Sequence, residues 1–242
     1  MNPEQSNNLR NEGVRNVGYA YILFSLTFLI SIISVLTEIS FLSYISILIG
    51  FAGLVIVIVS RKSLKHDFRR HLINGISIYI LFAIIAILGA TIYVVSVAFS
   101  IVTEYPSGNI PDGVISSLIV NTVIITVIPS LLYYISYYLL NIQFFKNNKF
   151  KLLIAALLTS LAFTLIGFIG EMETVFATLS SITTLSSAES AINLIKAHSI
   201  NLYSLFSILS AIILLVLFFY SGHELLTNPQ NYAKSDNDYG LY

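Results

Sequence analysis

Long uncharged stretches alternate with short polar segments along this chain. No Asp, Glu, Lys or Arg occurs in residues 16–37, 39–60, 72–103, 113–145, 152–170 and 199–222. A helix that crosses a membrane needs about 20 consecutive, mostly apolar residues. The pattern therefore predicts an all-α, polytopic integral membrane protein with about six transmembrane helices in a bundle, arranged as three hairpins.

The polar segments divide the chain into three parts. Residues 1–15 are expected to form an N-terminal segment, residues 16–222 the transmembrane domain, and residues 223–242 a tail. Only residues 37–40 separate the first two stretches. One continuous helix through both would be about 67 Å long, more than twice the thickness of the hydrocarbon core, so a tight hairpin is required here.

The connection at residues 171–197 differs from the others. It is rich in Ser and Thr, and Val175, Leu179, Ile182 and Leu185 follow one another at roughly helical spacing. This pattern is typical of an amphipathic arm that lies on the membrane surface or over the helices. A plain linker fits the composition equally well.

The distribution of charge predicts the orientation. All of the 12 Lys and Arg residues except Lys196 fall on one side of the predicted membrane. The other side has mostly acidic residues, namely Glu38, Glu104, Asp112, Glu171, Glu173 and Glu189. Positively charged loops stay in the cytoplasm. We therefore expect a multi-pass protein of the cell (plasma) membrane, embedded in the lipid bilayer, with both termini in the cytoplasm.

Composition excludes several classes of protein. Hydrophobic residues make up 56% of the chain and charged residues 10%, against about 25% charged in soluble domains. The net charge of zero argues against a nucleic-acid binder with a broad basic surface. The absence of Cys excludes disulfides and thiolate ligands. We find no Walker A, G-x-S-x-G or H-E-x-x-H motif, so we expect no enzyme, no cofactor and no metal site.

Three expected helices end near a glutamate, with the same spacing of small or hydroxyl side chains behind it. The three sets are Thr27, Ser31, Ser34 and Glu38; Tyr93, Val97, Ser100 and Glu104; and Ser160, Thr164, Gly167 and Glu171. Each set lies on one helix face, where small and hydroxyl residues let helices approach and hydrogen-bond. Glu38, Glu104 and Glu171 are thus a candidate outer vestibule for cations or protons. Alternatively, these ends are acidic only because basic residues are kept off this side.

The fourth expected helix contains Asn121 and Pro129. Proline inside a helix leaves a carbonyl without its donor and commonly bends the helix. The two residues are a candidate kink or gate, with a structural Asn and a tolerated Pro as the alternative. No ionisable residue lies at mid-membrane in any expected helix, which argues against proton-driven transport.

In its size, its lack of Cys and Trp and its many Ile, Ser and Tyr residues, the chain resembles uncharacterised multi-pass membrane proteins of thermoacidophilic archaea. One such protein is the polytopic membrane component of the archaeal DNA-import (Ced) apparatus. The resemblance concerns architecture and covers the whole chain. It implies a complex subunit with other membrane subunits, a separate ATPase and nucleic acid as cargo.

These observations leave three classes of function. The first is a pore-forming or scaffolding subunit of a multiprotein transport complex, with DNA import as one such system. The second is a stand-alone channel or carrier for a small or neutral solute, which Asn121, Pro129 and the outer glutamates would suit. The third is a structural membrane protein without transport.

Overall fold

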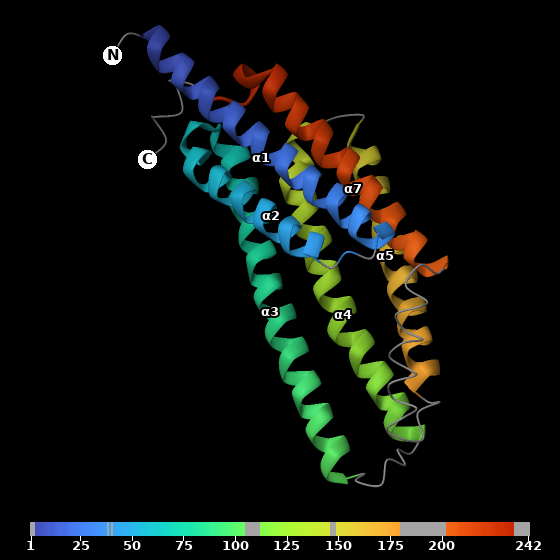
Figure 1. Ribbon diagram of the computed structural model, residues 1–242. Coiled ribbons are helices and arrows are strands. Elements are labelled where there is room, and N and C mark those ends of the chain that lie inside the picture. The colour runs from blue at the N-terminus through green and yellow to red at the C-terminus, as the bar shows by residue number, and fades with distance from the viewer. Residues whose placement is uncertain are drawn as a thin grey trace.

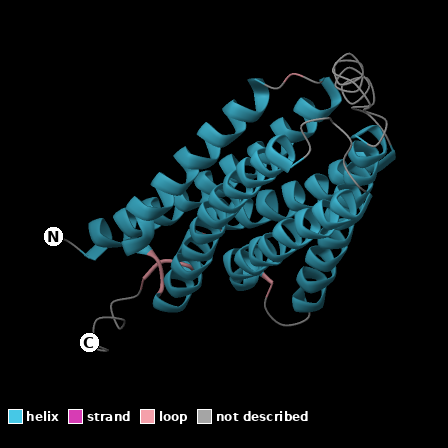
Figure 2. Ribbon diagram, turned by 90° about the horizontal axis from the view of Figure 1, so that it is seen from below, coloured by secondary structure: helices cyan, strands magenta, loops and turns pink. Residues whose placement is uncertain are grey.

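The computed structural model describes residues 3–37, 39, 41–104, 112–145, 149–179 and 202–234. Within these ranges the chain is helical apart from short connections and one antiparallel bridge between Leu64 and Ala233 (Figure 2). Its long helices are α1 (Pro3–Thr37), α2 (Phe41–Ser60), α3 (His66–Glu104), α4 (Asp112–Asn141), α5 (Phe150–Leu179) and α7 (Leu202–Thr227).

Five helical segments in the described part of the chain are long and apolar enough to cross a membrane. They are Gln5–Thr37, Phe41–Ser63, His66–Ile85, Phe150–Gly170 and Ser204–Thr227. The expected all-α class is thus confirmed, and the chain has the helices of a membrane protein. The remaining expected span, 113–145, falls mostly on α4, many of whose side chains lie outside the described set.

Two helices are longer than their uncharged stretches predict. α1 begins at Pro3, so most of the expected polar segment 1–15 belongs to this helix. Proline suits the first helical turn because its missing N–H would have no partner there. α5 continues to Leu179 because residues 171–179 contain no Gly or Pro to end it. The first nine residues of the expected outer arm are therefore part of α5, and residues 180–197 lie outside the described residues.

The helices contact one another in the order α2, α1, α7, α5, α4 and α3. α1, α2 and α7 run together, whereas α3 and α4 run more steeply and extend past the α1–α2 turn (Figure 1). α3 has 39 residues and α2 has 20, so at 1.5 Å per residue α3 is about 28 Å longer. α2 therefore does not reach the far end of α3.

Small and hydroxyl residues allow α1 to approach its neighbours closely. Gly18 and Gly222 face each other between α1 and α7, and a Cβ built on Gly222 would lie 3.0 Å from the Gly18 carbonyl oxygen. Between α1 and α2, the Ser46 hydroxyl donates to the Thr27 carbonyl at 3.1 Å, and the Ser34 and Ser43 hydroxyls are 3.1 Å apart. The predicted stripe on the first helix is therefore an α1–α2 contact, as its composition indicates.

Aromatic side chains fill the interior where α1, α4 and α7 meet. The ring of Phe218 is 1% exposed and contacts four other rings at centroid distances of 5.5–5.9 Å. These partners are Tyr21, Phe24 and Phe28 of α1 and Tyr137 of α4. Together the five residues form what we call the aromatic core.

The chain after α7 folds back onto the turn between α2 and α3. The Lys65 amide donates to the Tyr232 carbonyl at 2.9 Å, and the Lys234 amide donates to the Ser63 carbonyl at 2.9 Å. Arg10 adds a hydrogen bond from its guanidinium to the Lys234 carbonyl at 3.3 Å. Residues 228–234, which we call the C-terminal strap, thereby join both ends of the described chain to the α2–α3 turn. The expected tail at 223–242 is folded over this part of its length.

Candidate functional site

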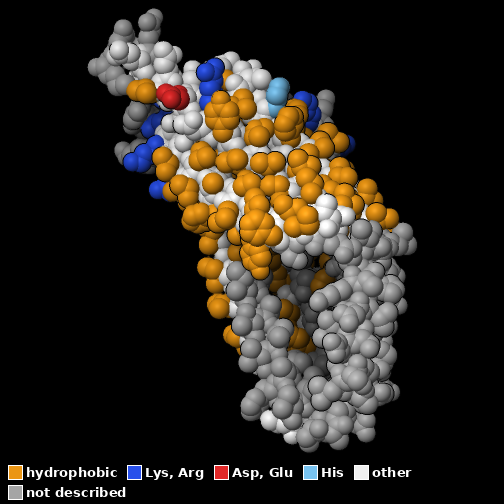
Figure 3. Space-filling view, in the orientation of Figure 1, with side chains coloured by type: hydrophobic (Ala, Val, Ile, Leu, Met, Phe, Trp, Pro, Cys, Tyr) orange, Lys and Arg blue, Asp and Glu red, His pale blue; other side chains and the backbone are white. Residues whose placement is uncertain are grey.

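The described Lys and Arg residues gather at one end of the molecule, which we call the basic end. They lie on the first half of α1, at the α2–α3 turn, at the start of α5 and in the C-terminal strap. Blue side chains mark this end in Figure 3, and hydrophobic side chains cover the neighbouring face. Arg61, Lys62 and Lys65 are exposed on the α2–α3 turn, and Arg70 is exposed near the start of α3. The fold therefore agrees with the one-sided charge distribution, whichever side of a membrane this end occupies.

Hydrogen bonds fix the charged groups beside the strap. The Lys149 ammonium donates to the Tyr220 hydroxyl at 2.9 Å, and this bond raises the pKa of Lys149 above its ordinary value. Burial, followed by the nearby Glu224 carboxylate, raises the pKa of Tyr232 above its ordinary value. Both shifts favour the protonated forms, and Tyr232 packs its ring against Phe68 and Phe144.

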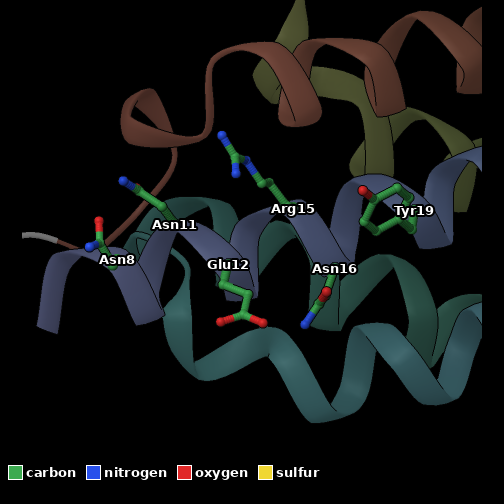
Figure 4. A pocket seen from close by; sticks show the side chains of 6 residues that line it. All are labelled: Asn8, Asn11, Glu12, Arg15, Asn16 and Tyr19. Atoms are coloured by element: carbon green, nitrogen blue, oxygen red, sulfur yellow. The ribbon is translucent and has the colours of Figure 1, made fainter. Parts of the chain in front are cut away.

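A polar pocket of about 430 Å³ lies on the outward face of α1 at this end. Six side chains line it at helical spacing, namely Asn8, Asn11, Glu12, Arg15, Asn16 and Tyr19. Arg15 points to the side of α7, whereas Glu12 and Asn16 point to the opposite side of α1 (Figure 4). The pocket thus combines carboxamides, one acid, one base and a phenol, and it has no net charge.

An apolar pocket of about 270 Å³ adjoins the polar one. Its lining is formed by Asn16 and Tyr19 of α1 together with Val55, Ile56, Val59 and Ser60 of α2. Asn16 and Tyr19 line both pockets, so the two cavities form one surface groove with a polar and an apolar half. We call this the α1–α2 groove.

A second polar cluster, which we call the hydroxyl cluster, lies inside the bundle between α4, α5 and α7. The Tyr134 hydroxyl is 2.8 Å from that of Ser160, 2.9 Å from that of Thr164 and 3.1 Å from that of Ser210. The Ser210 hydroxyl is also 2.7 Å from each of the other two. These distances are those of direct hydrogen bonds, so the hydroxyls bind one another and leave no room for an ion. The predicted stripe with Ser160 and Thr164 is a helix contact, as its composition indicates.

The three candidate vestibule glutamates have different positions along their helices. Glu104 is the last residue of α3, and its side chain is exposed. Glu171 was expected at a helix end but lies inside α5, which continues to Leu179. Glu38 and the side chain of Glu171 lie outside the described residues. The end of α3 is far beyond the α1–α2 turn (Figure 1), which weighs against one ring of carboxylates, and their convergence stays a prediction.

The candidate gate residues lie on one continuous helix. α4 runs through Pro129, whose side chain is buried, and Asn121 is exposed. Pro129 lies about one turn before Tyr133, whose ring contacts Tyr79 and Phe82 of α3, and before Tyr134 of the hydroxyl cluster. Neither residue lines either of the two pockets described above, so a gate at these positions stays a prediction.

The predicted sites and the observed groove have little in common. No group of three or more His, Asp or Glu side chains in the described ranges could hold a metal ion. The α1–α2 groove is not among the predicted sites, because the charge pattern places residues 1–15 outside the first helix. Its signal is nevertheless present, since Asn8, Asn11, Glu12, Arg15, Asn16 and Tyr19 recur at intervals of three or four residues.

Comparison with known proteins adds no family to this picture. No protein-family model, no curated protein and no solved structure matches the chain. The function must therefore be argued from the chain's own geometry, which is that of an all-helical protein with five helices able to span a membrane.

Proposed function

We propose that this protein is a membrane-embedded scaffolding subunit of a multi-subunit transport complex. The observation that carries the proposal is the extension of α3 and α4 past the α1–α2 turn. α3 alone is about 58 Å long, whereas the hydrocarbon core of a bilayer is about 30 Å thick. Tilt can absorb part of this difference, and the rest leaves apolar helix surface that other subunits can cover.

The exposed side chains of α3 support a protein contact there. Leu88 is 56% exposed and Ile92 is 65% exposed. They follow His66 by about 33 and 39 Å of helix, which is more than the length of about 30 Å of the 20-residue α2. An apolar surface that is left without lipid is stable in water only when it is covered. A partner subunit at this extension would cover it.

Where its side chains are described, the packing of the interior favours a scaffold over a solute pathway through one chain. The aromatic core occupies the space where α1, α4 and α7 meet. Among the described residues, every buried side-chain nitrogen or oxygen has a hydrogen-bond partner. A pathway for a polar solute needs free polar groups or water along its length. A stand-alone carrier is therefore the weaker alternative, and DNA as cargo rests on the architectural resemblance alone.

Site-specific photocrosslinking tests the proposal. We expect p-benzoylphenylalanine at Ile92 to form adducts with a defined partner protein in native membranes. The matched control is the same replacement at Ile47, which is 68% exposed on α2 and would face lipid. Adducts of equal yield at both positions, or at neither, would contradict a partner at the α3 extension.

Flux measurements separate scaffold from pore. The purified chain in liposomes should conduct neither potassium ions nor small neutral solutes above the level of empty liposomes. Reproducible conductance that is lost on changing Pro129→Ala or Asn121→Ala would replace the scaffold proposal with the channel alternative.

A further inference from the structure

The apolar half of the α1–α2 groove ends beside exposed cations. Val59 and Ser60 belong to its lining, and Arg61 and Lys62 follow them directly on the α2–α3 turn. Both cations are exposed, and no carboxylate of the described residues lies within ion-pair distance of either one. An occupant that fits this place combines an aromatic or apolar group with acidic groups next to it.

The C-terminal strap directs the residues that follow it toward this place. The Lys234 amide donates to the Ser63 carbonyl at 2.9 Å, and the pairing of the strap with the α2–α3 turn is antiparallel. The chain therefore leaves Lys234 in the direction from Ser63 to Arg61, and not toward α3. The next five residues, 235–239, read Ser-Asp-Asn-Asp-Tyr and lie outside the described residues. We call them the acidic segment.

The acidic segment has the chemistry that this end of the groove requires. Asp236 and Asp238 follow Lys234 by two and four residues, and Tyr239 comes next. Two carboxylates thus precede one aromatic ring, as two exposed cations precede the apolar cavity of about 270 Å³. Arg and Lys form charge-assisted hydrogen bonds with carboxylates. Tyrosine suits a cavity near the membrane boundary, because its ring is apolar and its hydroxyl can stay in water.

The groove is within reach of the acidic segment. Val59 precedes Ser63 by four helical residues and therefore lies about 13 Å from Lys234 across the pairing. Five extended residues span about 17 Å, which is enough to bring Tyr239 to Val59.

The path of the segment runs over the end of the turn. The Arg10 guanidinium bonds the Lys234 carbonyl at 3.3 Å, and Arg10 precedes Tyr19 of the groove by nine residues. Nine residues place the two side chains on opposite faces of α1. A chain that leaves Lys234 therefore crosses the end of the α2–α3 turn before it enters the groove, and Arg61 and Lys62 lie on that crossing.

We propose that the acidic segment folds over the α2–α3 turn and places Tyr239 in the apolar half of the α1–α2 groove. Asp236 and Asp238 then lie beside Arg61 and Lys62. Exposed ion pairs are individually weak, but the short connection to the strap gives the segment a high effective concentration at the turn.

This contact would shield the basic end from anionic partners. The turn and the start of α3 carry four exposed Lys or Arg residues, against the two exposed acids Glu12 and Asp67 nearby, which leaves a net charge of +2. The two aspartates of the segment neutralise that excess. An anionic surface would therefore gain access to the turn only after it displaces the segment.

Disulfide formation in the full chain tests the inference, since the chain has no Cys of its own. Asn237→Cys together with Val59→Cys places one thiol on each side of the contact and keeps both aspartates and Tyr239. The initial rate of oxidation is measured in phosphatidylcholine vesicles at low salt. Adding Asp236→Asn and Asp238→Asn should slow the reaction about fivefold, roughly the effect of two exposed ion pairs. Adding Tyr239→Ala instead should slow it by a similar factor.

Matched changes elsewhere separate a specific contact from simple tethering. Asp67→Asn removes an exposed carboxylate of α3, and Tyr44→Ala removes an exposed ring of α2. Each should leave the rate within about twofold, as surface changes away from the contact usually do. Equal rates in all variants would mean that the short connection alone brings the thiols together, and would overturn the inference. Phosphatidylglycerol vesicles in which the unaltered Cys pair reacts as slowly as its Asn variant would assign the turn to anionic lipid instead.

Discussion

The aromatic core and the hydroxyl cluster hold neighbouring helices together in different ways. In the aromatic core, large rings fill the space between α1, α4 and α7, and Phe218 alone contacts four rings. In the hydroxyl cluster, Tyr134 reaches small residues of α5 and α7 that hydrogen-bond directly. Packing energy depends on the volume that is filled, whereas hydrogen bonds within a membrane contribute little net energy each. The comparison therefore predicts that stability is concentrated in the aromatic core.

The largest effect is expected from removing the central ring. Phe218→Ala should lower the free energy of unfolding in detergent by about 3 kcal/mol. This value is the lower end of the range for a buried Phe, because detergent shields the apolar side chains of the unfolded chain from water. The control is Phe219→Ala, the next residue, which is 52% exposed. Denaturant titration followed by circular dichroism measures both. An equal loss in the two variants would mean that ring packing does not concentrate stability.

An intermediate effect is expected from the buried amide beside the core. Asn141 is fully buried, accepts a hydrogen bond from Ser221 at 2.6 Å and donates one to the Tyr137 carbonyl at 2.9 Å. Asn141→Ala leaves the Ser221 hydroxyl without this acceptor and should cost about 1–2 kcal/mol in the same titration. Asn74→Ala changes an exposed side chain and should cost less than about 0.5 kcal/mol, as surface substitutions usually do. A smaller loss of unfolding free energy in Asn141→Ala than in Asn74→Ala would contradict a stabilising role of the Asn141 hydrogen bonds.

The smallest effect is expected in the hydroxyl cluster. Tyr134→Phe keeps the ring and removes one hydroxyl, and the three remaining hydroxyls can still bind one another. We expect a loss of about 0.6 kcal/mol, the average for hydrogen bonds between membrane helices. Tyr138→Phe, whose ring packs on Phe150, is the control. A larger loss of unfolding free energy in Tyr134→Phe than in Phe218→Ala would mean that the hydroxyl cluster, and not the aromatic core, concentrates stability.

The sequence predicted the helices well because a span is a local property of composition. Six uncharged stretches correspond to the long helices, and the stripe at Thr27, Ser31 and Ser34 correctly indicated a contact between helices. Helix ends were harder to place, because charge alone does not end a helix. α1 includes the polar residues after Pro3 and continues through Gly13, and α5 includes Glu171, which no Gly or Pro follows before Leu179.

Contacts between distant segments could not be read from spacing. Nothing in the local pattern at Ser63–Lys65 indicates that Tyr232 and Lys234 would bind its backbone. The α1–α2 groove needs the register of two helices in addition to the polar spacing on one of them. The aromatic core likewise combines residues from three helices that are far apart in the sequence.

The C-terminal strap has a consequence for the order in which the protein is assembled during synthesis. Its partner, the α2–α3 turn, leaves the ribosome more than a hundred and fifty residues earlier than Tyr232. The backbone bonds of Lys65 and Lys234 therefore cannot form until α7 has been made and inserted. Until then, the first two helices are held at this end by their own contacts alone. Closure of the strap would thus be a late step, and it would be completed only in chains whose last helix has entered the membrane in the correct direction.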